Sequence, residues 1–236
     1  MKRIVQPELL DEMSSENPEA VEARRDLQWV NWWMGHAAIF RSALRGAFSS
    51  PPKSIVEIGA GDGSLLLRVA QMLRWDSRET TVWIVDREDT VSAATHMGFN
   101  QLGWRVNVVR SDVYEWWKSR GAEEVDLVVA NLFLHHFEEP ELQRLLRSIA
   151  DHATAFVGCE PRRSALAHFF ARQVWLIGAN RVTRVDAVRS VEAGFNETEL
   201  INLWPRRPHW KLTECRAGLF SHFFAALKCP DRAPVG

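Results

Sequence analysis

The sequence VEIGAGDGS at residues 56–64 is the most informative part of the chain for predicting the fold. It joins a short apolar run, residues 54–58, to residues 64–74, whose apolar side chains recur at helical spacing. The glycines allow the backbone to turn tightly and to approach a ligand closely. The stretch predicts a strand, a turn and a helix, in which the turn either binds a ligand or is only a tight structural connection.

Apolar runs and helical segments continue to alternate beyond this turn. Strands are expected at residues 81–85, 106–109, 125–130 and 155–158, and helices near residues 91–97, 114–119 and 139–149. Apolar strands separated by helices are typical of a parallel sheet that is covered on both faces. We therefore predict an α/β fold.

The beginning of the chain has a different, helical pattern. The Asn-Pro pair at residues 17–18 predicts a helix start, and helical spacing extends to about residue 45. The sequence SSPP at residues 49–52 interrupts it. We expect an N-terminal helical cap over residues 1–48, which could act as a lid, and a main domain over residues 49–236.

The last third of the chain departs from the alternation. A long apolar helix is expected at residues 164–177, an extended or irregular segment at 182–191, and strands at 210–213 and 220–227 that pair as a hairpin. Asn196 and Glu199 form a capping-box pattern, which predicts another helix that ends near Trp204.

Composition excludes several classes of function. The 236 residues include 29 Lys+Arg and 30 Asp+Glu, so the net charge of −1 gives no basic surface for nucleic acid or anionic lipid. No apolar stretch approaches the roughly 18 residues of a membrane helix, and the first residues lack the apolar core of a secretory signal. The three cysteines are too widely spaced for a disulfide framework. We expect a cytoplasmic protein without nucleic-acid or membrane partners.

Acidic residues in the glycine-rich turn narrow the choice of ligand. Glu57 precedes the first glycine by two positions, and Asp62 lies inside the turn. Carboxylates there would repel the pyrophosphate of a dinucleotide, which disfavours a dehydrogenase that uses NAD. They suit a ligand with an ammonium or sulfonium group.

Further polar residues follow the other predicted strands. Asp86 ends the second strand and could accept hydrogen bonds from a ribose diol. Asp112 follows the third strand and could bind an adenine amino group or cap a helix, while the stretch NLFLHHF at residues 131–137 leaves the fourth. Open parallel sheets bind ligands beyond the carboxyl ends of their strands, so the joint occurrence predicts one binding site.

With these motifs, residues 53–160 resemble the class I S-adenosylmethionine-dependent methyltransferases. The resemblance implies a seven-stranded, mostly parallel sheet with helices on both faces and an antiparallel C-terminal strand. It also implies S-adenosyl-L-methionine as the cofactor. The implied cofactor-binding residues are Glu57, Gly59, Ala60, Gly61, Asp86, Arg87, Asp112, Val113, Asn131 and Leu132.

A narrower resemblance concerns bacterial small-molecule methyltransferases of secondary metabolism. It rests on Asp26 and its neighbours, on Arg163 after the fifth strand, and on Arg184, Asp186 and Ser190. It implies an acceptor pocket built by the N-terminal helices and an insertion near residues 162–195. The acceptor contacts expected from it are Trp33, His136 and Arg163.

The pair His135-His136 has three possible roles. We expect no metal, because adjacent side chains should diverge and no third ligand has suitable spacing. His136 could be a general base, with Asp186 as the next candidate, or both histidines could only shape the pocket wall.

The expected activity is methyl transfer to a small aromatic or polyketide-like acceptor, with O-methylation slightly favoured. A non-catalytic regulatory protein that binds S-adenosylmethionine and a methyltransferase acting on protein or RNA stay open as alternatives. The oligomeric state also stays open, with a homodimer as one option.

Overall fold

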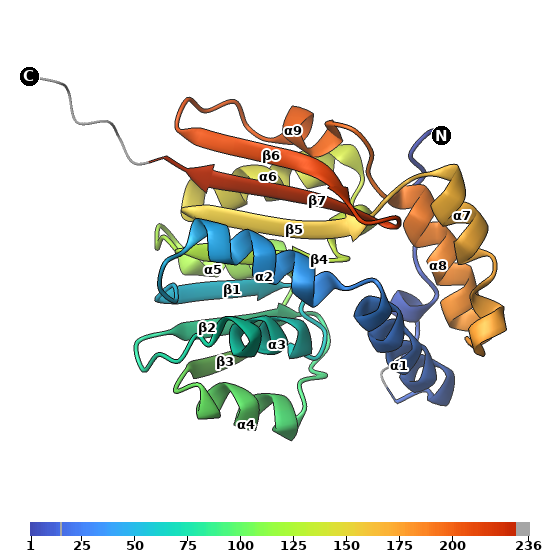
Figure 1. Cartoon of the computed structure of the whole chain (residues 1–236), viewed down its shortest axis with the longest axis horizontal. Helices are drawn as coiled ribbons and strands as arrows, with labels where there is room; N and C mark the ends of the chain where they lie inside the picture. Colours follow the sequence, from blue (N-terminus) through green and yellow to red (C-terminus); the bar gives the residue numbers. More distant parts are fainter. Residues whose placement is uncertain (15, 230–236) are drawn as a thin grey trace, which may run out of the picture.

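The computed structural model describes residues 1–14 and 16–229, except the side chains of residues 27–29, 31–33 and 177. A seven-stranded sheet with the order β3-β2-β1-β4-β5-β7-β6 forms its centre (Figure 1). Its strands are β1 (Ser54–Ile58), β2 (Thr81–Asp86), β3 (Arg105–Arg110), β4 (Leu127–Asn131), β5 (Ala155–Pro161), β6 (Trp210–Ala217) and β7 (Ser221–Lys228).

Helices precede and connect these strands. The α-helices are α1 (Pro18–Trp33), α2 (His36–Ala47), α3 (Ser64–Leu73), α4 (Ala93–Gln101), α5 (Val113–Arg120), α6 (Glu139–His152), α7 (Ala165–Ala171), α8 (Arg181–Ala193) and α9 (Glu199–Leu203). Short 3-10 helices are η1 (Leu10–Glu12), η2 (Leu134–His136) and η3 (Val174–Ile177). None of the helices in the described part of the chain has both the length and the apolarity needed to cross a membrane.

The direction of the strands confirms the predicted sheet. The first five strands pair in parallel, and β7 runs antiparallel between β5 and β6. The predicted C-terminal hairpin is therefore present. Since β7 begins where β5 ends, with Ser221 opposite Pro161, the turn before β7 lies at the same edge as the carboxyl ends of the parallel strands.

Two apolar layers hold the sheet. On one face, Val56 and Ile58 of β1 pack in a cluster with residues of α5, α6 and α9. On the other face, Ile55 belongs to a cluster with residues of α2, α3 and α4. Adjacent residues of a strand point to opposite faces, so an uninterrupted apolar run is what a sheet covered on both sides requires.

The N-terminal helices play two different parts. Helix α2 belongs to a covering layer, because its Phe40 and Leu44 are buried against the sheet with Ile55. Helix α1 instead stands beside α8, beyond the carboxyl ends of the strands (Figure 1). The two helices therefore pack in different places, because α2 belongs to the core and α1 does not cover the same face of the sheet. Only α1 and the segment before it, residues 1–33, could act as a lid.

The segment after β5 differs from the sequence prediction. Residues 182–191, expected to be extended or irregular, form helix α8, and the expected long helix at 164–177 is divided into α7 and η3. Valine and threonine in α8 favour strands, but Asn180 caps the helix by accepting a hydrogen bond of 2.9 Å from Thr183 N–H. Capping and burial outweigh local propensity here.

The predicted capping box near residue 196 forms only in part. The Glu199 carboxylate accepts a hydrogen bond of 2.9 Å from Asn196 N–H. Helix α9 nevertheless begins at Glu199 rather than directly after Asn196. The same Glu199 carboxylate also binds Arg163, which holds this turn against the end of β5.

Candidate functional site

The glycine-rich turn has the conformation that its sequence requires. Gly59, Gly61 and Gly63 all have positive φ, at 60°, 54° and 67°. A Cβ atom at position 59 would lie 2.1 Å from Cδ2 of Phe133. A side chain at this position would therefore face both backbone strain and overlap with an aromatic ring.

Asp86 fixes this turn from the end of β2. Its Oδ2 accepts a hydrogen bond of 2.8 Å from Gly61 N–H, and its Oδ1 accepts one of 3.0 Å from Glu88 N–H. Each carboxylate oxygen can accept more than one hydrogen bond, so Asp86 retains capacity for ligand hydroxyls. The Asp86 side chain thus connects the glycine-rich turn to the end of β2 through a hydrogen bond.

Glu57 is a buried acid beneath the turn. Its exposed fraction is 2 %, and its Oε2 has no hydrogen-bond partner among the described residues. Burial, reinforced by the charges of Asp62 and Asp86, raises the pKa of Glu57 to about 8. A cation placed beside Glu57 would favour its ionised form.

Asp112 caps helix α5 and also binds Arg87. One oxygen accepts a hydrogen bond of 2.8 Å from Tyr114 N–H, and the other lies 2.6 Å from Arg87 Nη2. Burial alone would raise the pKa of Asp112, but the hydrogen bonds from Arg87 and Tyr114 outweigh it and lower the pKa. Because the Arg87 side chain is 74 % exposed, this ion pair opens at little cost.

The chain leaves β4 in an unusual conformation. Leu132 has a φ of 51° and donates a hydrogen bond of 2.9 Å to the Cys159 carbonyl. A left-handed leucine is uncommon and turns the chain sharply at the edge of the sheet. Asn131, just before it, has a buried Oδ1 that lacks a partner in the described part of the chain.

The two histidines do not diverge as expected. Their ring centroids lie 4.2 Å apart with an interplanar angle of 32°. His135 is buried, with Nδ1 2.8 Å from Glu160 and Nε2 3.3 Å from Glu8. His136 Nδ1 lies 3.3 Å from Asp11. The expectation of separate directions was wrong, because η2 turns the backbone so that both rings face the N-terminal segment.

Glu160 organises the loop that carries these histidines. Its carboxylate accepts hydrogen bonds from the backbone N–H groups of Phe133, Leu134 and His135, at 3.0, 2.9 and 3.3 Å. Sequence reasoning gave Glu160 no special role. The sequence pattern that singles out Glu57 and Asp86, an acid at or near the end of an apolar strand, is also present at Glu160 and could have indicated it.

Two other sequence candidates have structural partners instead. The Arg163 guanidinium binds Glu199 and donates to the backbone carbonyls of Gly194 and Met1. The Asp186 carboxylate accepts hydrogen bonds of 2.7 and 3.0 Å from the N–H groups of Leu9 and Leu10. These residues hold the N-terminal segment, so neither is available as an acceptor contact or base in this conformation. The Trp33 side chain lies outside the described residues.

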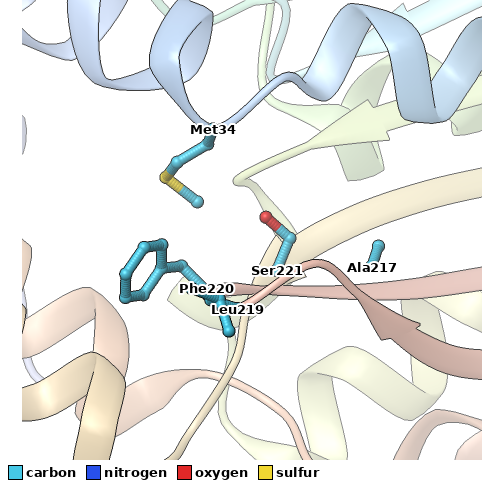
Figure 2. Close-up of a pocket in the computed structure, with 5 residues that line it drawn as sticks. All are labelled: Met34, Ala217, Leu219, Phe220 and Ser221. Atoms are coloured by element: carbon cyan, nitrogen blue, oxygen red, sulfur yellow. The ribbon is translucent and has the colours of Figure 1, made fainter.

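A small cavity of 220 Å³ opens at the same edge of the sheet (Figure 2). Met34 from the turn between α1 and α2 faces the turn between β6 and β7 across it. The described lining residues are Met34, Ala217, Leu219, Phe220 and Ser221. The cavity is therefore mainly apolar, with one hydroxyl group in its wall.

That hydroxyl belongs to a buried polar pair. Ser221 Oγ lies 3.0 Å from Nε2 of His36, whose exposed fraction is 0 %. Burial lowers the pKa of His36 to about 4, so the ring is neutral at physiological pH. Asn131 lies beside this ring. In the sequence, His36 stands at helical spacing from Trp29, Trp32 and Trp33, which predicts a core-facing stripe or a lid but does not indicate the pairing with Ser221.

The comparisons with known proteins agree with this geometry. Residues 55–155 match the family model described as "Methyltransferase domain". No curated protein matches the sequence. The structure of the plantazolicin methyltransferase BpumL in complex with SAH is similar to this chain, with a TM-score of 0.64, 14% identity, and coverage of 91% of this chain and 92% of that one.

Two further solved structures share the fold. An O-methyltransferase family protein from Burkholderia thailandensis has a TM-score of 0.55 and 15% identity, over 96% of this chain and 78% of that one. The mitomycin 7-O-methyltransferase MmcR has a TM-score of 0.58 and 15% identity, over 93% of this chain and 60% of that one. Residues 55–155 thus match a methyltransferase domain model, and the chain as a whole has the fold of the class I, S-adenosylmethionine-dependent methyltransferases.

The buried acid Glu57 makes stability depend on pH. Its pKa rises from 4.5 to about 8 on folding, so the folded state retains a proton that the unfolded state loses. The free energy of unfolding of the ligand-free protein should therefore fall as pH increases from about 4.5 to about 8. Urea unfolding at several pH values should show this slope in the natural protein and a weaker one in Glu57→Gln.

The exposed Glu115→Gln variant is the control for a general effect of removing an acid. It should retain the slope of the natural protein. An unchanged slope in Glu57→Gln would contradict the assignment of this pH dependence to Glu57.

Proposed function

We propose that this protein transfers a methyl group from S-adenosyl-L-methionine to a small-molecule acceptor. The observation that carries the proposal is the joint placement of the glycine-rich turn, Glu57 and Asp86 at one edge of the sheet. The match to a methyltransferase domain supports it, as does SAH, the demethylated product of this cofactor, in the BpumL structure.

Each part of the proposed cofactor site meets a different chemical need. Glu57 supplies negative charge for the methionine ammonium, and the turn at Gly59–Gly61 lets the backbone approach the methionine part closely. Asp86 accepts hydrogen bonds from the ribose hydroxyls. Asp112 and its neighbour Val113 flank the adenine once the exposed pair with Arg87 opens.

We place the methyl acceptor in the cavity between Met34 and Phe220 (Figure 2). Its apolar walls suit a flat, apolar group. In the tautomer that carries its proton on Nδ1, the neutral His36 ring accepts a hydrogen bond from Ser221 Oγ–H, and Ser221 Oγ can then accept a hydrogen bond from an acceptor hydroxyl. This arrangement favours O-methylation.

The chemistry requires alignment more than strong base catalysis. Methyl transfer from a sulfonium is an in-line displacement, so the enzyme must orient donor and nucleophile and exclude water. With a pKa of about 4, His36 is a weak base and serves to orient Ser221. A phenol fits this site better than an aliphatic alcohol, because its hydroxyl donates a stronger hydrogen bond to Ser221 Oγ and loses its proton to water more readily as the methyl group is transferred. His136 ranks second as a candidate for the general base, because it contacts Asp11 and is not among the described residues that line the cavity.

The role proposed for Asp86 predicts a loss of cofactor affinity. Asp86→Ala should weaken binding of S-adenosylmethionine by roughly 1.5–3 kcal/mol, because charge-assisted hydrogen bonds to the ribose disappear. Isothermal titration calorimetry measures this change. Asp89→Asn, a change three residues along the same loop, is the control, and equal affinities of the two variants would count against the proposed ribose contact.

The role proposed for Ser221 predicts a selective loss at the acceptor. Ser221→Ala should lower kcat/KM for a phenolic acceptor by roughly 2- to 12-fold, the equivalent of one neutral hydrogen bond. Affinity for S-adenosylmethionine should not change. The assay is transfer of a labelled methyl group to a panel of aromatic hydroxyl and amine compounds, with Ser148→Ala on α6 as the control.

The panel also tests the proposed activity itself. Labelled product from a phenol and none from the amines would support O-methylation. Cofactor binding without transfer to any member would favour the regulatory alternative. A Ser221→Ala variant that loses cofactor affinity but keeps its KM for the acceptor would contradict the placement of the acceptor in this cavity.

The lid hypothesis now concerns residues 1–33. Deleting them should abolish methyl transfer, because α1 and the N-terminal segment cover the strand ends beside α8. Cofactor binding should stay measurable, since Phe40 and Leu44 of α2 remain to complete the core. Full activity in a folded truncated protein would disprove the lid.

A further inference from the structure

The N-terminal segment brings a third polar side chain to the two histidines. Glu8 lies far from them in sequence, but its carboxylate is within 3.3 Å of His135 Nε2. One potential ligand atom from each of Glu8, His135 and His136 lies within 4.8 Å of the other two. The sequence offers no third ligand close to the two histidines, but the fold brings Glu8 to them from a distant part of the chain.

One pair of these atoms already has the spacing of ligands in a metal site. Tetrahedral Zn²⁺ with ligands at roughly 2.0–2.1 Å has neighbouring ligand atoms roughly 3.3–3.4 Å apart. The distance between His135 Nε2 and Glu8 Oε1 is 3.3 Å. His136, with 26 % of its side chain exposed, leaves the cluster accessible from solvent. A small movement of His136 would complete a three-ligand site with an open fourth position.

Carboxylates contact a ring nitrogen of each histidine, and for His135 this nitrogen is the one that faces away from Glu8. His135 Nδ1 binds Glu160 at 2.8 Å, which leaves Nε2 directed at Glu8. His136 Nδ1 lies 3.3 Å from Asp11. Histidines that bind metals commonly have a carboxylate on the other ring nitrogen, because it fixes the ring and increases its basicity. The backbone N–H groups of η2 hold Glu160 in turn.

Local charge also favours a divalent cation. Four carboxylates surround the cluster, from Glu8, Asp11, Glu160 and Asp186, and two guanidinium groups approach it, from Arg3 and Arg189. The carboxylates around the cluster outnumber these two guanidinium groups, which favours a cation at this position.

We propose that Glu8, His135 and His136 form a binding site for a divalent transition-metal ion of the Zn²⁺ type. Imidazole and carboxylate ligands suit Zn²⁺, Co²⁺ and Ni²⁺ better than they suit Ca²⁺ or Mg²⁺. The ion would link the N-terminal segment to η2 in addition to the hydrogen bonds of Arg3. This site is separate from the proposed acceptor cavity and does not depend on the proposed methyl transfer.

The competing possibility is that a proton alone occupies the cluster. A doubly protonated His135 would then bridge Glu160 and Glu8 through two hydrogen bonds. Metal and proton exclude each other at Nε2, because the metal needs the unprotonated nitrogen. Direct titration with a metal ion therefore separates the two possibilities.

The experiment titrates the full-length, metal-free protein with ZnCl₂ by calorimetry at pH 7.5. The natural protein should bind one equivalent. Glu8→Gln and His136→Asn should each weaken Zn²⁺ binding by more than roughly 10-fold. The loss of a group that binds the metal directly should lower the affinity at least as much as the loss of a carboxylate that only orients such a group. Asp11→Asn should weaken Zn²⁺ binding by roughly 10-fold. Glu12→Gln and His96→Asn are the matched controls and should bind as the natural protein does.

Two additional measurements keep the test decisive if a variant folds poorly. The natural protein with Co²⁺ should show visible d–d absorption, which Zn²⁺ abolishes by displacement. Zn²⁺ should also raise the Tm of the natural protein but not that of His136→Asn, which removes a partly exposed side chain and one proposed ligand. The absence of saturable Zn²⁺ and Co²⁺ binding, or binding that persists unchanged in Glu8→Gln and His136→Asn, would overturn the proposal.

Discussion

A carboxylate that is buried wholly or in part stays ionised only where it has hydrogen-bond donors or a cation beside it, and this constraint organises the edge of the sheet at the carboxyl ends of the strands. Glu57, Asp86 and Glu160 end or nearly end β1, β2 and β5. Asp86 is satisfied by the backbone of the glycine-rich turn, and Glu160 by the backbone of η2 and by His135. Glu57 keeps an oxygen without a partner in the described residues. The difference marks where a cationic ligand is needed.

The same constraint divides the edge into two regions. On the β1 and β2 side, a turn that excludes side chains lies over an acid that lacks a partner, which suits a zwitterionic cofactor. On the β5 side, carboxylates and histidines join the N-terminal segment to η2 and α8. The apolar cavity with Ser221 opens at the start of β7 on this same edge. A cofactor and an acceptor can therefore meet above the sheet.

The sheet and the positions of the acids at its edge could be predicted because their signals are local. Each apolar strand is continuous in sequence, and each acid follows its strand directly. Helix α8 could not be predicted, because its valines favour a strand and only capping by Asn180 and tertiary burial make it helical. The contacts of His36 and Glu8 could not be predicted, because their partners, Ser221 and His135, lie far away in the sequence.

A crystal structure with bound S-adenosylhomocysteine tests the central claim most directly. We expect the methionine part to lie against Gly59–Gly61, its ammonium beside Glu57 and the ribose hydroxyls at Asp86. The sulfur should face the cavity that contains Ser221. A ligand bound elsewhere, or one whose sulfur faces away from that cavity, would contradict the account.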